Sequence, residues 1–210
     1  MYTLYYSPSS ASFVVHWLLL ELDLPHQLRR VDLASKQQKS AEYLALNPNG
    51  VVPTLLVDDQ PVFECAAQLL YLADAHPQAG LAPLAGTVER AHYYQWVVHF
   101  ANALLPTMRH WFYPAEAAGE AATEAAQACA VESISASWTR IDAHLAANGP
   151  YLLGEQLSAA DFLLIMLMRW SRNLPCHALD WPALRALADR MRARESFKRV
   201  CEVEELTEWL

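Results

Sequence analysis

The chain has 210 residues, of which 54% are hydrophobic and 18% are charged, and its formal net charge is −8 at pH 7. The length favours two domains, the composition excludes a disordered chain, and no apolar run reaches the roughly 18 residues that a membrane span requires. The acidic charge argues against nucleic acid as a partner, so a small anionic ligand would need a helix N-terminus or a few local cations.

The first part of the chain alternates short strand patterns with helix patterns. The loop 7–10 (Ser-Pro-Ser-Ser) separates an aromatic strand from an apolar helix, and a later strand carries Pro53 at its start. The predicted strands cover 2–6, 28–33, 51–57 and 61–63, and the predicted helices cover 11–22, 36–46 and 64–75. The order β-α-β-α-β-β-α predicts a thioredoxin-like α/β domain, in which helices cover the faces of a small mixed sheet.

Almost everything after residue 86 has the pattern of long helices. These are predicted at 87–112, 120–147, 158–173, 181–193 and 195–203. Ser158 and Asp161 have the form of an N-terminal capping box, and the helix that follows is apolar on nearly all faces, which predicts burial at the centre of its domain. Because prolines and glycines gather before residue 87, we expect a first domain at 1–77, a linker at 78–86 and an all-helical domain at 87–210.

The cysteines and histidines indicate no metal or disulfide framework. The four cysteines are widely separated and form no Cys-x-x-Cys pair, which favours free thiols in a reducing compartment. The eight histidines show no tight ligand spacing either. The opening MYTLYYSPSS lacks a basic segment followed by an apolar stretch, so we expect no targeting peptide and a cytoplasmic protein.

Three segments, in this order along the chain, resemble the soluble glutathione transferases. They are 5–10 (YYSPSS), 47–55 (NPNGVVPTL) and 63–72 (FECAAQLLYL), and the capping box at 158–161 falls where the family's helical domain carries its own. The resemblance implies a thioredoxin-like domain that binds glutathione and an all-helical domain that shapes the pocket for a second substrate. It also implies an enzyme that presents the glutathione thiolate to a hydrophobic electrophilic small molecule, and a homodimer.

The resemblance assigns the peptide backbone of glutathione to Val52 and Pro53, and its γ-glutamyl end to Glu64 and Cys65. A cis bond between Val52 and Pro53, which the family implies, would leave the Val52 amide and carbonyl free to pair with a peptide ligand. Residue 65 begins a helix whose unpaired N–H groups favour a carboxylate, and Glu64 would face the ammonium group. The family usually has serine where this chain has Cys65, and the weaker thiol donor would reduce the affinity for glutathione.

The glutathione thiol, with a pKa of roughly 8.5, needs a nearby hydroxyl to form its thiolate at neutral pH. In the serine-type members this hydroxyl lies in a Ser-Ser-x-Ser stretch, which makes Ser9 the first candidate and Ser10 or Ser12 the next. Tyr5 or Tyr6 on the first strand, or no side chain at all, remains an alternative, and Ser9 or Ser10 would in that case only cap the helix. A cysteine-type member would place its cysteine where this chain has an alanine, so that chemistry is not expected.

Two further groups of site residues are expected by resemblance. Lys36 and Gln38 would bind the glycine end of glutathione, with an exposed helix face as the alternative interpretation. Polar and aromatic residues at helical spacing early in the second domain would line the pocket for the second substrate. They are His99, Asn102, Leu105, Pro106, His110 and Trp111.

Two other functions remain open. The position of Cys65 beside the ligand is compatible with glutathione-dependent thiol–disulfide reduction, although the loop before the first helix contains no cysteine. The departure from serine at position 65 also leaves a non-catalytic protein of the same fold, with a binding or regulatory role, as an alternative.

Overall fold

The computed structural model describes residues 1–209, and the contacts within the chain divide it into two units. The first contains residues 1–82 together with the segment that begins at Arg192, and the second contains residues 83–191. The sequence pattern places 87–210 in one helical domain. The structure joins the end of the chain to the first unit, because the last helix packs on the first one.

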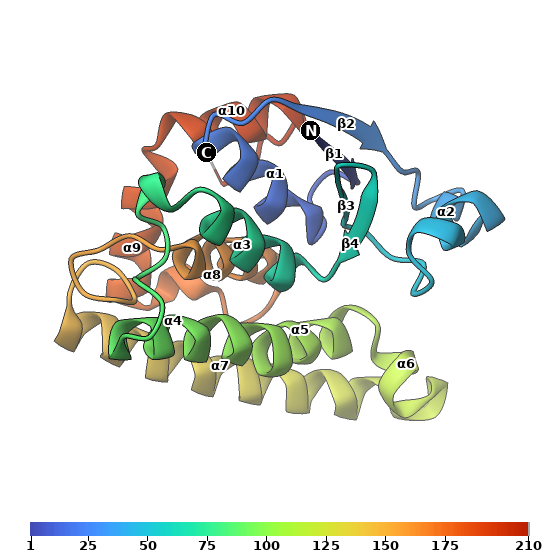
Figure 1. The fold of residues 1–210 in the computed structure, drawn as a ribbon. Helices are drawn as coiled ribbons and strands as arrows, with labels where there is room; N and C mark the ends of the chain where they lie inside the picture. Colours follow the sequence, from blue (N-terminus) through green and yellow to red (C-terminus); the bar gives the residue numbers. More distant parts are fainter. Residues whose placement is uncertain (210) are drawn as a thin grey trace. The chain divides into compact units, whose positions relative to one another are not determined.

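The sheet of the first unit has four strands in the order β2-β1-β3-β4 (Figure 1). β1 runs parallel to β2 and antiparallel to β3, and β3 runs antiparallel to β4. The strands are β1 (Tyr2–Tyr6), β2 (His26–Arg30), β3 (Thr54–Val57) and β4 (Gln60–Phe63). This sheet confirms the predicted thioredoxin-like arrangement, although β3 begins three residues later than the pattern indicates.

Four α-helices and two short 3₁₀ turns complete the first unit. They are α1 (Ser12–Glu21), η1 (Gln37–Lys39), α2 (Ala41–Leu46), α3 (Cys65–Ala75), η2 (Pro77–Ala79) and α10 (Glu195–Val203). α1 contacts β1, α3 and α10, so that every residue from 12 to 19 is buried. A helix enclosed in this way needs an apolar surface all round, which is what the sequence of α1 provides.

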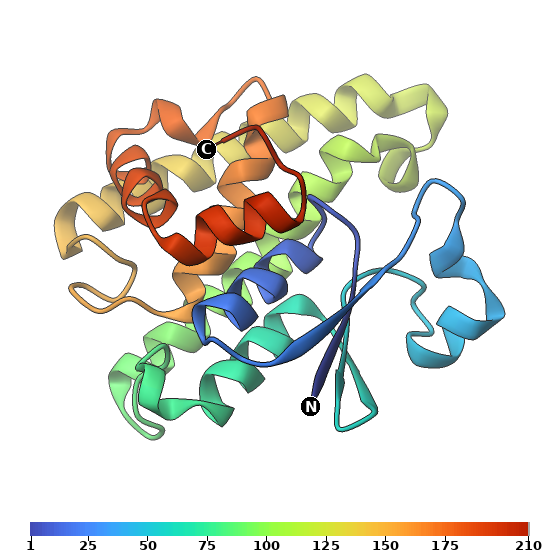
Figure 2. The ribbon, with the colours of Figure 1, turned by 90° about the horizontal axis from the view of Figure 1, so that it is seen from above.

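The last helix of the chain lies along the first (Figures 1 and 2). The ring of Phe197 lies 5.0 Å from that of Trp17, whose Nε1 donates a hydrogen bond to Ser196 Oγ at 2.9 Å. At the C-terminal end of α1, one turn after Trp17, Glu21 accepts hydrogen bonds from Arg194 and Ser196. α10 therefore covers the side of α1 that would otherwise expose its aromatic residues.

A smaller cluster occupies the opposite face of the sheet. Side chains alternate between the two faces of a strand, so Tyr5 points away from the side that carries its neighbours Leu4 and Tyr6. Tyr5 packs there against the buried residues Val31, Tyr43 and Val52. Tyr43 belongs to α2, and this cluster fixes the position of the segment between α2 and β3.

The regular elements of the second unit, residues 83–191, are helices. The unit contains α4 (Val88–His99), α5 (Leu105–Phe112), α6 (Pro114–Ala118), η4 (Glu120–Ala122), α7 (Thr123–Asn148), α8 (Ala159–Trp170), η5 (Ser171–Asn173), η6 (Ala178–Asp180) and most of α9 (Pro182–Arg192). The loop between α7 and α8 contains two isolated β-bridges, Tyr151 with Gly154 and Leu153 with Gln156. α5 packs along α7, and α4 contacts α8. Within residues 1–209, no helix combines the length and the apolar character needed to cross a membrane.

The helix predicted at 87–112 is interrupted in its middle. α4 ends at His99, and residues Phe100–Leu104 form one π-helical turn, η3, before α5 begins. The N–H of Leu105 donates to the carbonyl of Phe100, and Pro106 has no N–H with which to continue an α-helical ladder. The proline therefore coincides with a wider turn that the sequence pattern did not predict.

The capping box at the start of α8 is present as predicted. The Asp161 carboxylate accepts hydrogen bonds from the N–H of Ser158 at 2.8 Å and from the N–H of Leu152 at 2.9 Å. Burial raises the pKa of Asp161 to about 6, against the opposing effect of these hydrogen bonds. Residues 159–169 are all buried, which confirms that the apolar helix belongs to the interior of its unit.

Candidate functional site

Three segments meet at one end of the sheet in the first unit. Three residues lie side by side across β1, β3 and β4, because Tyr5 pairs with Thr54 and Thr54 pairs with Phe63. Just beyond this row, β1 continues into the loop before α1, β3 begins after Pro53, and β4 continues into Glu64. The structure therefore brings together the three segments that the sequence analysis singled out, although they are separated by about 40 and 10 residues along the chain.

The loop before α1 is held by its own serines. The hydroxyl of Ser10 donates to the carbonyl of Ser7 at 2.7 Å and lies 2.8 Å from Ser12 Oγ. Ser12 Oγ donates to the same carbonyl at 3.0 Å and accepts from the Ser7 N–H at 3.1 Å. The hydroxyls of Ser10 and Ser12 are thus engaged in fixing the loop.

Ser9 is held from the other end of the chain. Its backbone is left-handed, with φ 63°, and its N–H donates to Glu204 Oε2 at 3.0 Å. Glu204 Oε1 lies 2.9 Å from Nδ1 of His16, and both of these side chains are almost fully buried. Sequence reasoning missed Glu204 because a contact across 195 residues leaves no local pattern.

The two candidate tyrosines of β1 point to opposite faces of the sheet. Tyr6 is buried, and its ring centroid lies 5.8 Å from that of His16 on α1. The ring of Tyr5 lies 5.9 Å from that of Tyr43. Only Tyr6 therefore shares a side of the sheet with the helix that follows the serine loop.

The peptide bond between Val52 and Pro53 is cis, as the resemblance implies. Within residues 1–209, neither the N–H nor the C=O of Val52 makes a hydrogen bond. The preceding carbonyl, of Val51, is by contrast held by Tyr43 Oη and by Asn47 Nδ2, each at 2.8 Å. A fixed backbone with an available amide and carbonyl is able to pair with an extended peptide.

Glu64 and Cys65 form the entry to α3. Glu64 has an unusual backbone, with φ 70° and ψ 108°, and its side chain is exposed, whereas Cys65 is buried as the first residue of the helix. Burial, followed by the charge of Glu64, raises the pKa of the Cys65 thiol to about 12. Cys65 therefore stays protonated at neutral pH and does not act as a thiolate nucleophile.

Lys36 precedes η1 and Gln38 lies within it, after β2. Lys36 is exposed and left-handed, with φ 61°. Gln38 is half-buried, and its Oε1 is buried without a hydrogen-bond partner in the described part of the chain. Lys39, which the sequence analysis did not select, donates to the carbonyl of Asn49 at 3.2 Å and so ties this turn to the segment before β3.

The residues expected to line the second-substrate pocket belong to the second unit and follow each other through α4, η3 and α5. His99 ends α4, Asn102 lies in the π-helical turn, and Leu105, His110 and Trp111 belong to α5. Burial, followed by the charge of Arg140, lowers the pKa of His99. The expected set thus forms one continuous stretch of helix, in which Asn102 and His110 are exposed and the others are partly buried.

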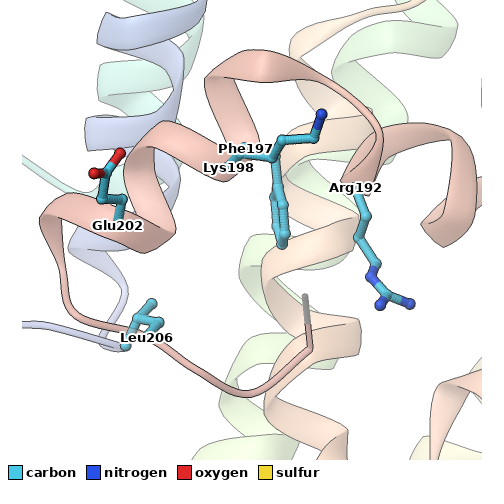
Figure 3. A pocket seen from close by; sticks show the side chains of 5 residues that line it. All are labelled: Arg192, Phe197, Lys198, Glu202 and Leu206. Atoms are coloured by element: carbon cyan, nitrogen blue, oxygen red, sulfur yellow. The ribbon is translucent and has the colours of Figure 1, made fainter.

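A cavity of about 390 Å³ lies against α10 in the first unit (Figure 3). Its lining residues are Arg192, Phe197, Lys198, Glu202 and Leu206. None of the residues selected from the sequence lines it, and Lys198 is paired with Glu195 Oε1 at 2.5 Å. The cavity is therefore separate from the segments that meet at the end of the sheet.

Within residues 1–209, no three His, Cys, Asp or Glu side chains are grouped so that they could hold a metal ion. The four cysteines are free thiols, of which only Cys129 is exposed.

Two family models match the chain. The model described as "Glutathione S-transferase, N-terminal domain" covers residues 8–75, and that described as "Glutathione S-transferase, C-terminal domain" covers residues 100–195. Among curated proteins, the chain is 33% identical over 205 residues to "Glutathione S-transferase GST-4.5" of Xanthomonas campestris pv. campestris, covering 97% of this chain and 98% of that protein. It is 30% identical to "Disulfide-bond oxidoreductase YfcG" of Escherichia coli, covering 92% and 91% of the two chains.

Solved structures agree with these matches. The structure of "BphK, a bacterial GST" has 35% identity and a TM-score of 0.87, covering 97% of this chain and 100% of that one. A glutathione transferase homologue from Sulfitobacter, whose structure was solved with bound glutathione, has 31% identity and a TM-score of 0.89, covering 97% and 98% of the chains.

Proposed function

The chain belongs to the glutathione S-transferase family, and we propose that it binds glutathione where β1 and β4 end and β3 begins, and presents the glutathione thiolate for attack on an electrophilic small molecule. The observation that carries this proposal is the meeting of the serine loop, the cis Val52–Pro53 bond and the start of α3 at one place. These segments offer a hydroxyl, an unpaired peptide backbone and a helix N-terminus. Together they match the thiol, the backbone and the γ-glutamyl carboxylate of one tripeptide.

Each end of the tripeptide has a partner in this proposal. The N–H and C=O of Val52 pair with the cysteinyl residue, the first N–H groups of α3 bind the γ-glutamyl carboxylate, and Glu64 faces the ammonium group. Gln38 and Lys36 bind the glycine end. The Lys36 ammonium and the Gln38 amide N–H groups are the donors for the glycine carboxylate, because the buried Oε1 of Gln38 is only an acceptor.

Ser9 is the residue that we assign to thiol activation. The hydroxyls of Ser10 and Ser12 are occupied by the carbonyl of Ser7. The Glu204 carboxylate holds the Ser9 backbone N–H at 3.0 Å and so fixes the position of this residue in the loop. A hydroxyl that donates to sulfur stabilises the thiolate and lowers the pKa of the bound thiol.

Calorimetric titration with reduced glutathione tests binding, and the pH dependence of aryl-halide conjugation tests activation. We expect a Kd between about 1 μM and a few mM for the wild type, which is the range of ordinary substrate affinities. Ser9→Ala should retain binding, move the pKa of the bound thiol towards roughly 8.5, and reduce kcat at neutral pH by about 10- to 100-fold.

Ser10→Ala is the matched control for Ser9→Ala, because it removes a hydroxyl from the same loop. It should keep the low thiol pKa, since the Ser10 hydroxyl binds the loop itself. Absence of glutathione binding by the wild type would reject the function, whereas an unchanged pH profile in Ser9→Ala would reject only the role of Ser9.

A second candidate function is glutathione-dependent disulfide reduction, because the chain is 30% identical to the disulfide-bond oxidoreductase YfcG. The buried Cys65 thiol with its pKa of about 12 does not favour it, because exchange requires an accessible thiolate. Turnover of a mixed disulfide faster than of an aryl halide, in parallel assays, would favour reduction over conjugation.

The second substrate is proposed to bind along the stretch from His99 to Trp111. This stretch supplies aromatic surface with a few polar groups, which suits a hydrophobic electrophile. Trp111→Ala should raise KM for the aryl halide while leaving the Kd for glutathione unchanged. A change in the glutathione Kd alone would argue against the assignment.

We also infer a homodimer that acts in the cytoplasm. Tyr71 on α3 and Val88, Tyr94 and Val98 on α4 are exposed large apolar residues, as is typical of an interface between subunits. The wild type should sediment as a dimer, and Val98→Glu should shift it towards the monomer, while a monomeric wild type would refute the inference. The free cysteines agree with a reducing compartment.

A further inference from the structure

Gln68 is a polar residue on a buried, mostly apolar helix face. It lies near the start of α3. The other buried residues of this helix are Cys65, Leu69, Leu72 and Ala73. Gln68 itself has no exposed surface. A primary amide in such surroundings destabilises the fold unless its N–H and C=O groups find partners.

The amide nitrogen of Gln68 lies between the residue that precedes β3 and a residue of β4. Nε2 donates to the carbonyl of Val62 at 2.7 Å and lies 3.5 Å from the carbonyl of Pro53. The backbone N–H of Gln68 donates to the carbonyl of Glu64 at 3.0 Å. The side-chain amide thus links the residue before β3 to β4, whereas the bond to Glu64 is the ordinary backbone bond of the first helical turn.

These contacts flank the two places that the proposed function assigns to glutathione. Pro53 follows Val52, whose backbone is to pair with the peptide, and Glu64 precedes the helix that is to bind the carboxylate. Glu64 has φ 70°, a conformation that L-residues rarely adopt and that persists only where the surroundings hold it. The side-chain amide of Gln68 contributes to that hold, because it bonds the carbonyl of Val62, two residues before Glu64, and lies beside the carbonyl of Pro53.

The amide oxygen of Gln68 shows that stability alone does not account for this residue. Within residues 1–209, Gln68 Oε1 is buried and has no hydrogen-bond partner. An unbranched apolar side chain of similar length, such as methionine, would fill the same space without this unpaired acceptor. Local choices that oppose stability tend to occur where function requires them.

We propose that Gln68 is a positioning residue for glutathione: its side-chain amide links Pro53 to Val62, and so holds the Val52–Pro53 segment at a fixed spacing from the end of β4 that leads into Glu64. The proposal rests on the proposed function. Gln68 acts through these two backbone carbonyls, without contacting the ligand itself, so it affects binding of glutathione and not the chemical step.

The variant Gln68→Met tests this assignment, with Leu69→Met as the matched control on the same buried helix face. We expect Gln68→Met to raise both the Kd and the KM for glutathione by about 5- to 10-fold, as loss of one such hydrogen bond implies. kcat at saturating glutathione should stay within about twofold, and Tm should stay within about 4 °C of the wild type. Leu69→Met should leave Kd, KM and kcat unchanged.

A second variant, Gln68→Glu, keeps the test independent of how well methionine packs. A protonated glutamic acid is able to donate to the Val62 carbonyl, whereas a carboxylate is not, and burial raises the pKa of such a group. The affinity of this variant for glutathione, relative to the wild type, should therefore fall as the pH rises from about 5 to 8.

The outcomes separate the two proposals. Wild-type affinity in Gln68→Met, or a pH-independent affinity ratio in Gln68→Glu, would overturn the positioning role and leave the transferase function standing. No glutathione binding by the wild type would overturn both. A loss of kcat at saturation with unchanged Kd would also contradict the proposal, because it would place Gln68 in the chemical step.

Discussion

Replacing Glu204 by alanine tests whether the end of the chain holds the loop that precedes α1. The substitution removes the acceptor of the Ser9 N–H, at 3.0 Å, and the partner of His16 Nδ1, at 2.9 Å. His16 is 1% exposed, so water cannot replace the lost carboxylate there. Leaving two such donors without their acceptor costs about 1–3 kcal/mol each, so we expect the free energy of unfolding to fall by about 3–5 kcal/mol in total.

For a chain of this length, the loss corresponds to a decrease in Tm of about 6–20 °C, measurable by thermal or urea unfolding followed by tryptophan fluorescence. Ser9 is left-handed in the native loop, and without Glu204 that loop is free to relax. We therefore also expect kcat/KM for aryl-halide conjugation to fall by about tenfold or more. Glu202→Ala, an exposed change on the same helix, is the control. If Glu204→Ala were as stable and as active as Glu202→Ala, the reasoning about this contact would be wrong.

Three further predictions concern individual residues. Cys65→Ser should lower the Kd for glutathione by about 2- to 10-fold in calorimetry, because a hydroxyl donates more strongly than a thiol. In the wild type, the Cys65 thiol has a pKa of about 12 and should resist alkylation by iodoacetamide at pH 8, as measured by mass spectrometry. The pKa of Asp161 is raised from 3.8 to about 6 in the native state, so between these pH values the native state binds a proton that the unfolded state does not. The free energy of unfolding of the wild type, relative to Asp161→Asn, should therefore fall by up to about 3 kcal/mol between pH 4 and pH 6 and stay level above pH 6. Tyr43→Phe removes the hydroxyl that donates to the Val51 carbonyl, and should cost about 1–2 kcal/mol in urea unfolding and raise the KM for glutathione; an unchanged KM would show that this carbonyl does not position Val52.

The regular elements could be predicted because their signals are local. The aromatic strand, the serine loop and the apolar helix after it follow one another within the first 22 residues, and the capping box marks the start of α8 by spacing alone. The cis bond at Pro53 came from the resemblance, and the structure contains it. The π-helical turn was missed, because a proline indicates a break in a helix without saying how the preceding turn adapts.

The parts of the site that escaped prediction depend on contacts between distant residues. The helix from Glu195 to Val203 was predicted, but its packing against α1 follows from tertiary structure and moves this segment out of the expected helical domain. Glu204 looked like one of several acidic residues near the end of the chain. Gln68 looked like an ordinary polar residue, because its role requires two carbonyls that only the paired strands bring within reach.

The packing of α10 on α1 also sets the order in which this protein can assemble on the ribosome. Residues 1–82 leave the exit tunnel first, yet the side of Trp17 that faces α10 has no cover until Ser196 and Phe197 have been synthesised. At about 5–20 residues per second, the interval is on the order of ten seconds. During that time the nascent first unit exposes an aromatic face that chaperones recognise, and a message truncated before residue 195 would yield a chain that never hides it.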